Sequence, residues 1–142
     1  MESTWSLHPQ LAADTVAVGD LALSRVLLAN DVNYPWLILV PRKPGMVDLI
    51  DLATNEQAQI LSEIDASARA LKALTHCDKL NIAALGNQVP QLHVHVIARF
   101  RCDAAWPKPV WGVTPPRVYA PAARDALVTS LRQRLAIAAP AG

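Results

Sequence analysis

The spacing of hydrophobic and polar positions changes along the chain, and each spacing predicts a different kind of element. Residues 15–29 alternate with a period of two on either side of Gly19-Asp20, which predicts a β-hairpin with this dipeptide as its turn. Residues 36–40 are apolar throughout and are closed by Pro41, so they predict a short buried strand. The first third of the chain is therefore expected to form a strand meander.

Helical spacing occurs in two places. Apolar residues recur every three or four positions within residues 55–75, which predicts a long helix. A row of leucines follows Pro121, a residue type favoured at the first helical position, and predicts a C-terminal helix. Further strands are expected at about 79–83 and 91–98. This order of elements predicts an α+β fold with a mostly antiparallel sheet.

Composition narrows the picture to one domain. The chain has 142 residues, of which 52% are hydrophobic and 18% are charged. A chain of this length builds a single core without needing a metal or disulfides. We therefore expect one domain over residues 1–142, with a core at about 15–105 and a proline-rich arm and C-terminal helix at 106–142.

Charge and targeting signals exclude several classes of protein. The net charge of +1 is too small for the broad positive surface that binds duplex nucleic acid or an anionic membrane. No stretch approaches the roughly 18 apolar residues of a membrane span, and residues 1–5 lack the features of a signal peptide. Cys77 and Cys102 form no paired motif, so we expect reduced thiols. A cytoplasmic location follows by elimination.

The strand predicted at 91–98 carries the candidate chemistry. Side chains alternate between the two faces of a strand, so its apolar residues share the core face. These residues are Leu92, Val94, Val96 and Ala98. Gln91, His93 and His95 then lie in a row on the opposite face, beside a loop at 86–90 that carries Gly, Asn and Gln.

Three interpretations of this polar row compete. The first is a half-exposed strand with an incidentally polar outer face. The second is a metal site on His93 and His95, because paired imidazoles bind zinc, which prefers four ligands. Candidates for the remaining ligands, none at a tight ligand spacing, are His76, Cys77, Cys102 and Asp103.

The third interpretation is nucleophilic catalysis at phosphorus. Imidazole has a pKa of about 6.5, so much of it is unprotonated at neutral pH and can attack. The phosphoimidazole that forms then gives up its phosphoryl group readily, which divides one difficult displacement into two. Backbone amides of the glycine-containing loop, with the side chains of Asn87 and Gln88, would hold the phosphate oxygens.

A longer motif surrounds the paired histidines. The run comprises Asn81 and then Gly86-Asn87-Gln88-Val89-Pro90-Gln91-Leu92-His93-Val94-His95-Val96-Ile97-Ala98-Arg99. It resembles the signature of the histidine triad (HIT) family, in which an Asn and a Gly-Gln-x-Val precede three histidines that alternate with apolar residues. Asn30-Asp31-Val32 and the strand from Trp36 to Arg42 are also similar to the family, over roughly residues 15–105.

This resemblance implies a hydrolase or transferase that acts at the α-phosphate of a nucleotide conjugate, without a metal or other cofactor. By position, His93 matches the nucleophile that becomes nucleotidylated, and His95 matches the histidine that contacts the phosphate or the departing group. Asp31 matches the acid that binds the ribose hydroxyls, with the base in an apolar pocket near the first strands. Three polar residues match positions at the phosphate or the site's edge, namely Asn81, Asn87 and Gln88. Relatives pair through sheet and helix edges, which implies a homodimer.

Two departures from the family pattern bear on activity. Gln91 replaces the first histidine of the triad, and Trp36 replaces an upstream histidine that supports it. A Gln side chain hydrogen-bonds but does not titrate, so a proton relay through position 91 is lost. The main-chain carbonyl of Gln91 can still orient the ring of His93 by accepting its Nδ1 proton. We expect a slow or differently tuned enzyme, and the alternative is a nucleotide-binding or sensing module with weak catalysis.

Other residues near the arm have two interpretations each. Trp106 and Trp111 either cap a ligand pocket or a partner subunit, or they anchor the arm on its own sheet. Arg99 either approaches a phosphate or the arm, or is a solvated surface residue, which we prefer from the sequence alone.

Overall fold

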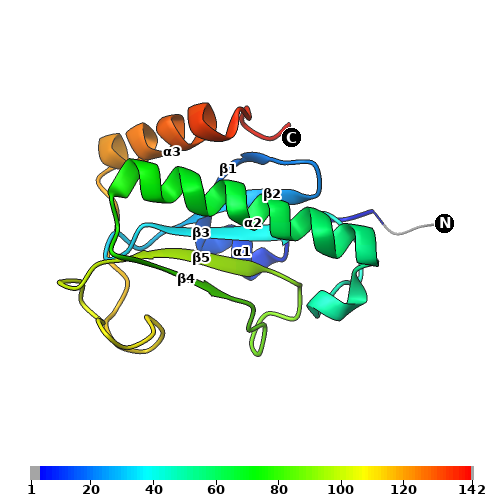
Figure 1. Cartoon of the computed structure of the whole chain (residues 1–142), viewed down its shortest axis with the longest axis horizontal. Helices are drawn as coiled ribbons and strands as arrows, with labels where there is room; N and C mark the ends of the chain where they lie inside the picture. The colour runs from blue at the N-terminus through cyan, green and yellow to red at the C-terminus, as the bar shows by residue number, and fades with distance from the viewer. Residues whose placement is uncertain (1–3, 142) are drawn as a thin grey trace.

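Five antiparallel strands form one sheet in the order β1-β2-β3-β5-β4 (Figure 1). The computed structural model describes residues 4–141, so part of the N-terminal stretch considered above as a signal peptide lies outside the described residues. The strands are β1 Thr15–Asp20, β2 Ser24–Ala29, β3 Trp36–Pro41, β4 Lys79–Ala83 and β5 Val94–Arg99. The helices are α1 Pro9–Ala13, the 3-10 turn η1 Leu49–Asp51, α2 Thr54–Thr75 and α3 Pro121–Leu135. The predicted α+β fold with a mostly antiparallel sheet is confirmed.

One face of the sheet is covered by α2 and α3, which lie side by side in Figure 1. The predicted core residues of β5 point to this face and pack with apolar side chains of β2, β3 and α2. Both helices begin close to where the sequence predicts, and Pro121 occupies the first turn of α3. No helix within residues 4–141 is long and apolar enough to cross a membrane.

The opposite face of the sheet is covered by two separate segments of the chain. The N-terminal segment, including Trp5 and Leu11, packs on apolar side chains of β2 and β3. Ala105, just before the arm, and Val110, within it, pack on Tyr34 and Ile97. His93 and His95 also lie on this face, so the candidate site is on the side of the sheet opposite to α2 and α3.

The predicted hairpin turn at Gly19-Asp20 is wrong. Both residues belong to β1, which has an irregularity in register at Val18, and the connection to β2 is residues 21–23. A glycine is needed at position 19 for a different reason, because a Cβ there would collide with the main-chain oxygen of Ala138. The C-terminal segment therefore crosses β1 at the one position without a side chain.

The turn at 21–23 is fixed by a buried carboxylate of α2. Glu63 is 3% exposed, and its two oxygens accept the backbone N–H groups of Leu23 at 2.7 Å and Ser24 at 2.9 Å. Hydrogen bonds to an ionised group are stronger than neutral ones and satisfy two donors that the sheet leaves unpaired. This long-range contact joins the helix layer to the first hairpin and explains why local turn chemistry at Gly19-Asp20 does not decide the connection.

Candidate active site

His93 and His95 lie side by side on the face of the sheet opposite to α2 and α3. His93 immediately precedes β5 and His95 is its second residue, and both side chains are 6% exposed. Their ring centroids are 4.9 Å apart, with the rings nearly perpendicular. Alternation along β5 puts Val94 between them on the core face, as the sequence predicts.

The ring of His93 is oriented by main chain. Its Nδ1 lies 2.6 Å from the carbonyl oxygen of Gln91. Because a carbonyl only accepts, Nδ1 carries the proton and the lone pair of a neutral ring is on Nε2. The expected orienting contact from residue 91 is therefore present, and it requires no particular side chain there.

The ring of His95 is oriented by an indole. The Nε1–H of Trp36 donates to His95 Nδ1 at 3.0 Å. Burial, and after it the neighbouring His93, lowers the pKa of His95 from 6.5 to about 4. His95 is therefore neutral at physiological pH and carries its single proton on Nε2.

A cavity of about 540 Å³ opens beside these two rings, a size typical of small-molecule sites. The predicted site residues that line it are Asp31, Asn87, Gln88, His93 and His95. Its apolar wall contains Leu11, Ala29 and Ile38, from the N-terminal segment, β2 and β3. This wall lies near the first strands, where the resemblance implies the base.

Asp31 is a buried acid that lines this cavity. It is 7% exposed, and its Oδ1 accepts the backbone N–H groups of Asn33 at 3.0 Å and Arg117 at 3.3 Å. Burial and the charge of Asp31 raise the pKa of Tyr119. Asp31 thus holds the end of the arm against the β2–β3 loop and presents a carboxylate to the cavity.

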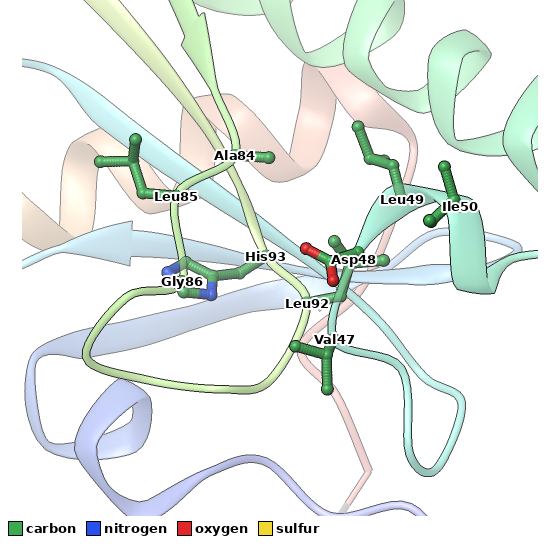
Figure 2. A pocket seen from close by; sticks show the side chains of 9 residues that line it. All are labelled: Val47, Asp48, Leu49, Ile50, Ala84, Leu85, Gly86, Leu92 and His93. Atoms are coloured by element: carbon green, nitrogen blue, oxygen red, sulfur yellow. The ribbon is translucent and has the colours of Figure 1, made fainter.

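A second cavity of about 320 Å³ adjoins His93, and the sequence alone did not reveal it. It shares Leu85, Gly86 and His93 with the larger cavity. Figure 2 shows Ala84, Leu85 and Gly86 on one side and Val47, Asp48, Leu49 and Ile50 on the other. Gly86 has a φ of 76°, a left-handed conformation that favours glycine and turns the loop between the cavities. The only signal in the sequence was the apolar run that begins at Val47.

Two predicted site residues lie elsewhere, because neither Asn81 nor Gln91 lines either cavity. The side-chain amide of Gln91 accepts from His8 N and donates to Ser6 O, both at 2.9 Å. Its side chain therefore holds the N-terminal segment, and only its main-chain carbonyl contacts His93. Asn81 accepts a hydrogen bond from Arg99 at 2.7 Å instead of facing a ligand.

The preferred interpretation of Arg99 as a solvated residue is wrong. Arg99 is 1% exposed, pairs with Asp103 and donates to the main-chain oxygen of Lys108 at 2.8 Å. Position 99 lies on the same face as the histidines, and an acid follows four residues later, which is the signal that could have revealed the pair. Trp106 covers the guanidinium, whereas Trp111 lies against His95 and lines the larger cavity. One tryptophan therefore anchors the arm and the other contributes to the site.

The residues proposed as further metal ligands are not gathered around the paired histidines. His76 ends α2 in a left-handed conformation, Cys77 is buried in the core, and Asp103 is paired with Arg99. Within residues 4–141, no group of three His, Cys, Asp or Glu side chains is placed to hold a metal ion. The donor set at His93 and His95 thus offers two ligands, fewer than a structural or catalytic zinc site uses.

Comparison with known proteins identifies the family. The HIT domain family profile matches residues 10–102. A histidine triad protein from Bradyrhizobium japonicum is 55% identical with a TM-score of 0.92, over 94% of this chain and 99% of that chain. Histidine triad proteins from Marinobacter aquaeolei and Sinorhizobium meliloti are 42% and 36% identical, with TM-scores of 0.91 and 0.90, over 94% of this chain and 98% and 99% of theirs. No curated protein sequence matched the chain. With its paired histidines on the face of this sheet opposite to α2 and α3, the chain belongs to the HIT family, whose members are generally nucleotide-binding hydrolases and transferases.

Proposed function

We propose that this protein cleaves or transfers at the α-phosphate of a nucleotide conjugate through a nucleotidyl intermediate on His93. The observation that carries the proposal is the 2.6 Å contact between His93 Nδ1 and the carbonyl of Gln91, at the wall shared by two cavities. In the neutral ring this contact puts the lone pair on Nε2, which is the atom that attacks phosphorus.

The proposed reaction consists of two successive displacements at phosphorus. The lone pair of His93 Nε2 forms a bond to phosphorus, and the bond between phosphorus and the leaving group breaks with its electron pair on the leaving group, which takes a proton from water. Water then attacks the phosphorus, the bond from phosphorus to Nε2 breaks, and the nucleoside monophosphate and one proton are released. Nδ1 keeps its proton and its hydrogen bond to Gln91 throughout both steps.

Neutral N–H groups would hold the phosphoryl oxygens. Among the residues described, neither cavity is lined by a lysine or an arginine. The available donors are the amides of the loop at Gly86, the side chains of Asn87 and Gln88, and the Nε2–H of His95. Fixed dipoles of this kind stabilise charge that develops in a transition state without reorganising.

The two cavities suggest places for the two halves of the substrate. The larger one, with Asp31 in its lining and an apolar wall, suits the ribose and base. The smaller one would receive the leaving group. Because its lining is apolar apart from Asp48 and His93, it suits an apolar group that is neutral or positively charged better than a polyphosphate.

A nucleotide-binding module without turnover is the second candidate, and one observation favours it. The lowered pKa of His95 leaves it without an acidic proton at neutral pH, and Gln91 does not titrate. The leaving group would then depend on water for its proton. Binding without chemistry is the expected behaviour if that assistance is insufficient.

Mass measurement of the intact protein separates these functions. Wild-type protein is mixed separately with an adenylated amine and with a dinucleoside polyphosphate. Each reaction is then quenched, and the mass of the intact protein is measured by mass spectrometry. An adduct of one nucleoside monophosphate, absent in His93→Ala, supports the proposed enzyme, and its mass names the nucleoside. Nucleotide binding measured by calorimetry without any adduct or turnover favours the binding module. Activity that a chelator abolishes would contradict both and point to a metal enzyme.

We also propose that the protein is a homodimer that pairs through the edge at β4. This strand is the last in the sheet, so one side of its backbone has no partner strand. Exposed apolar side chains lie on this strand and around the cavity at its end, namely Ile82, Leu85, Leu49 and Ile50. Light scattering tests the proposal, because Ile82→Lys at a β4 interface is expected to give monomers, whereas Val118→Lys, at an exposed apolar residue of the arm, is not.

A further inference from the structure

Two neighbouring imidazoles on one strand are held in opposite tautomers by partners of opposite kind. The carbonyl of Gln91 only accepts, so His93 carries its proton on Nδ1. The indole of Trp36 only donates, so His95 must offer the lone pair of Nδ1 and carry its proton on Nε2. One ring thus presents a lone pair to the cavity side and the other presents an N–H.

We propose that Trp36 is a positioning residue that fixes His95 as a permanent Nε2–H donor for the phosphoryl group bound at His93. This inference rests on the proposed function for its role in catalysis, whereas the tautomer itself stands on the geometry alone. A histidine at position 36 would donate or accept according to its own protonation state, but an indole N–H has one role.

The indole is itself held in place. Its ring meets those of Tyr34 and Trp111 edge to face, at centroid distances of 6.4 and 5.7 Å, and Tyr34 is 1% exposed. In the register of β3 and β5, Trp36 is opposite Ile97, and Ile38 is opposite His95. The indole therefore approaches His95 diagonally across the two strands. Turning the N–H away from His95 would leave it without this acceptor in a partly buried position.

The surroundings of His95 also oppose a second proton. Its ring is packed between His93, Trp36 and Trp111, and burial lowers its pKa to about 4. A protonated ring would place an Nδ1–H against the indole N–H. Among the described lining residues there is no lysine or arginine that could bind a phosphate. An N–H donor of fixed orientation would therefore stabilise the phosphoryl oxygens in place of a positive charge.

Nitrogen NMR of the full chain, labelled with ¹⁵N-histidine and without substrate, tests the tautomer. Correlation spectra distinguish the two neutral forms and the cation, and His95→Gln assigns the signals. We expect the wild type to carry the His95 proton on Nε2 at neutral pH. In Trp36→Phe we expect a mixture of the neutral tautomers or partial protonation. Trp111→Phe, which removes the other indole against His95, should leave the Nε2–H form unchanged.

A wild-type His95 with its proton on Nδ1, or a Trp36→Phe spectrum identical to that of the wild type, would overturn the proposal. If Trp36→Phe does not fold, hydrogen exchange of the wild-type indoles decides instead, because the Trp36 N–H should exchange far more slowly than that of Trp111. Where the wild type forms the His93 adduct, Trp36→Phe should slow its formation about tenfold at saturating substrate with a smaller change in KM. An expected spectrum without any adduct would refute the proposed reaction and leave the tautomer assignment intact.

Discussion

Arg99 and Asp103 form a buried, two-pronged ion pair where the chain leaves β5 for the arm. Nε and Nη2 of Arg99 lie 2.8 and 3.1 Å from the two oxygens of Asp103, and the side chains are 2% and 3% exposed. The same carboxylate accepts the backbone N–H of Trp106 at 2.7 Å. Asp103 therefore joins the sheet to the arm that carries Trp111 into the site.

Removing one partner of this pair should destabilise the protein strongly. Asp103→Ala leaves a buried guanidinium without its counter-charge, and we expect the free energy of unfolding to fall by about 3 kcal/mol. Urea unfolding measures the change. Asp65→Ala breaks an exposed pair with Arg69 on α2 and should cost less than about 0.5 kcal/mol. Equal effects in the two variants would show that burial of the Arg99 pair adds nothing.

Acid should release this pair only at low pH. Burial alone would raise the pKa of Asp103, but hydrogen bonds from Arg99 and from backbone N–H groups outweigh burial and hold it below its usual 3.8. A lowered folded-state pKa gives stability that is present above the unfolded value and is lost as the pH falls through the folded value. The protection of the arm from limited proteolysis in the wild type, relative to Asp103→Asn, should therefore stay constant down to about pH 4 and shrink below it.

His95 should make the folded state sensitive to milder acid. Its folded pKa of about 4 lies below the unfolded value of 6.5, so the unfolded chain gains its proton first as the pH falls. We expect this group to lower the free energy of unfolding by about 2 kcal/mol between about pH 7.5 and about pH 5. Urea unfolding at both pH values checks this, and His95→Gln should lose that part of the pH dependence. An unchanged pH dependence in the variant would refute a buried neutral His95.

The sheet could be predicted from the sequence more completely than the turns and the cavities. Alternation placed Val94 and His95 on opposite faces, because the period of a strand is local. The turn at residues 21–23 was wrongly predicted at Gly19-Asp20, because Glu63, far away in sequence, decides the connection. The cavity at Asp48 depends on two loops that only the folded chain brings together, so the apolar residues that begin at Val47 do not reveal it by themselves.

Asp31 should confer preference for ribose over deoxyribose. If its carboxylate accepts a ribose hydroxyl, Asp31→Ala should weaken binding of a ribonucleoside monophosphate by about tenfold to a hundredfold and that of the 2′-deoxy form much less. Calorimetry with both nucleotides measures the ratio. Asp14→Asn, at another acid that lines the same cavity, should keep the wild-type preference. A preserved preference in Asp31→Ala would place the ribose elsewhere.

Gln91 should act on the N-terminal segment and not on the chemistry. Gln91→Ala removes the side-chain contacts to Ser6 and His8 but keeps the carbonyl that orients His93. We expect faster hydrogen exchange of the His8 amide, with formation of the His93 adduct within about threefold of the wild type. Gln91→His should not accelerate turnover, since its side chain starts outside both cavities. A large gain would mean that this side chain can swing into the site.

Because core residues and histidines take alternate places along β5, the length of this strand is constrained more tightly than its composition. Exchanging one apolar residue of the strand for another keeps both faces intact. Inserting or deleting one residue between His93 and Arg99 would turn the side chains on one side of the change to the wrong face of the sheet, so binding and folding would fail together. Variation in this protein should therefore accumulate as substitutions within β5, with changes in length confined to the loops at its two ends.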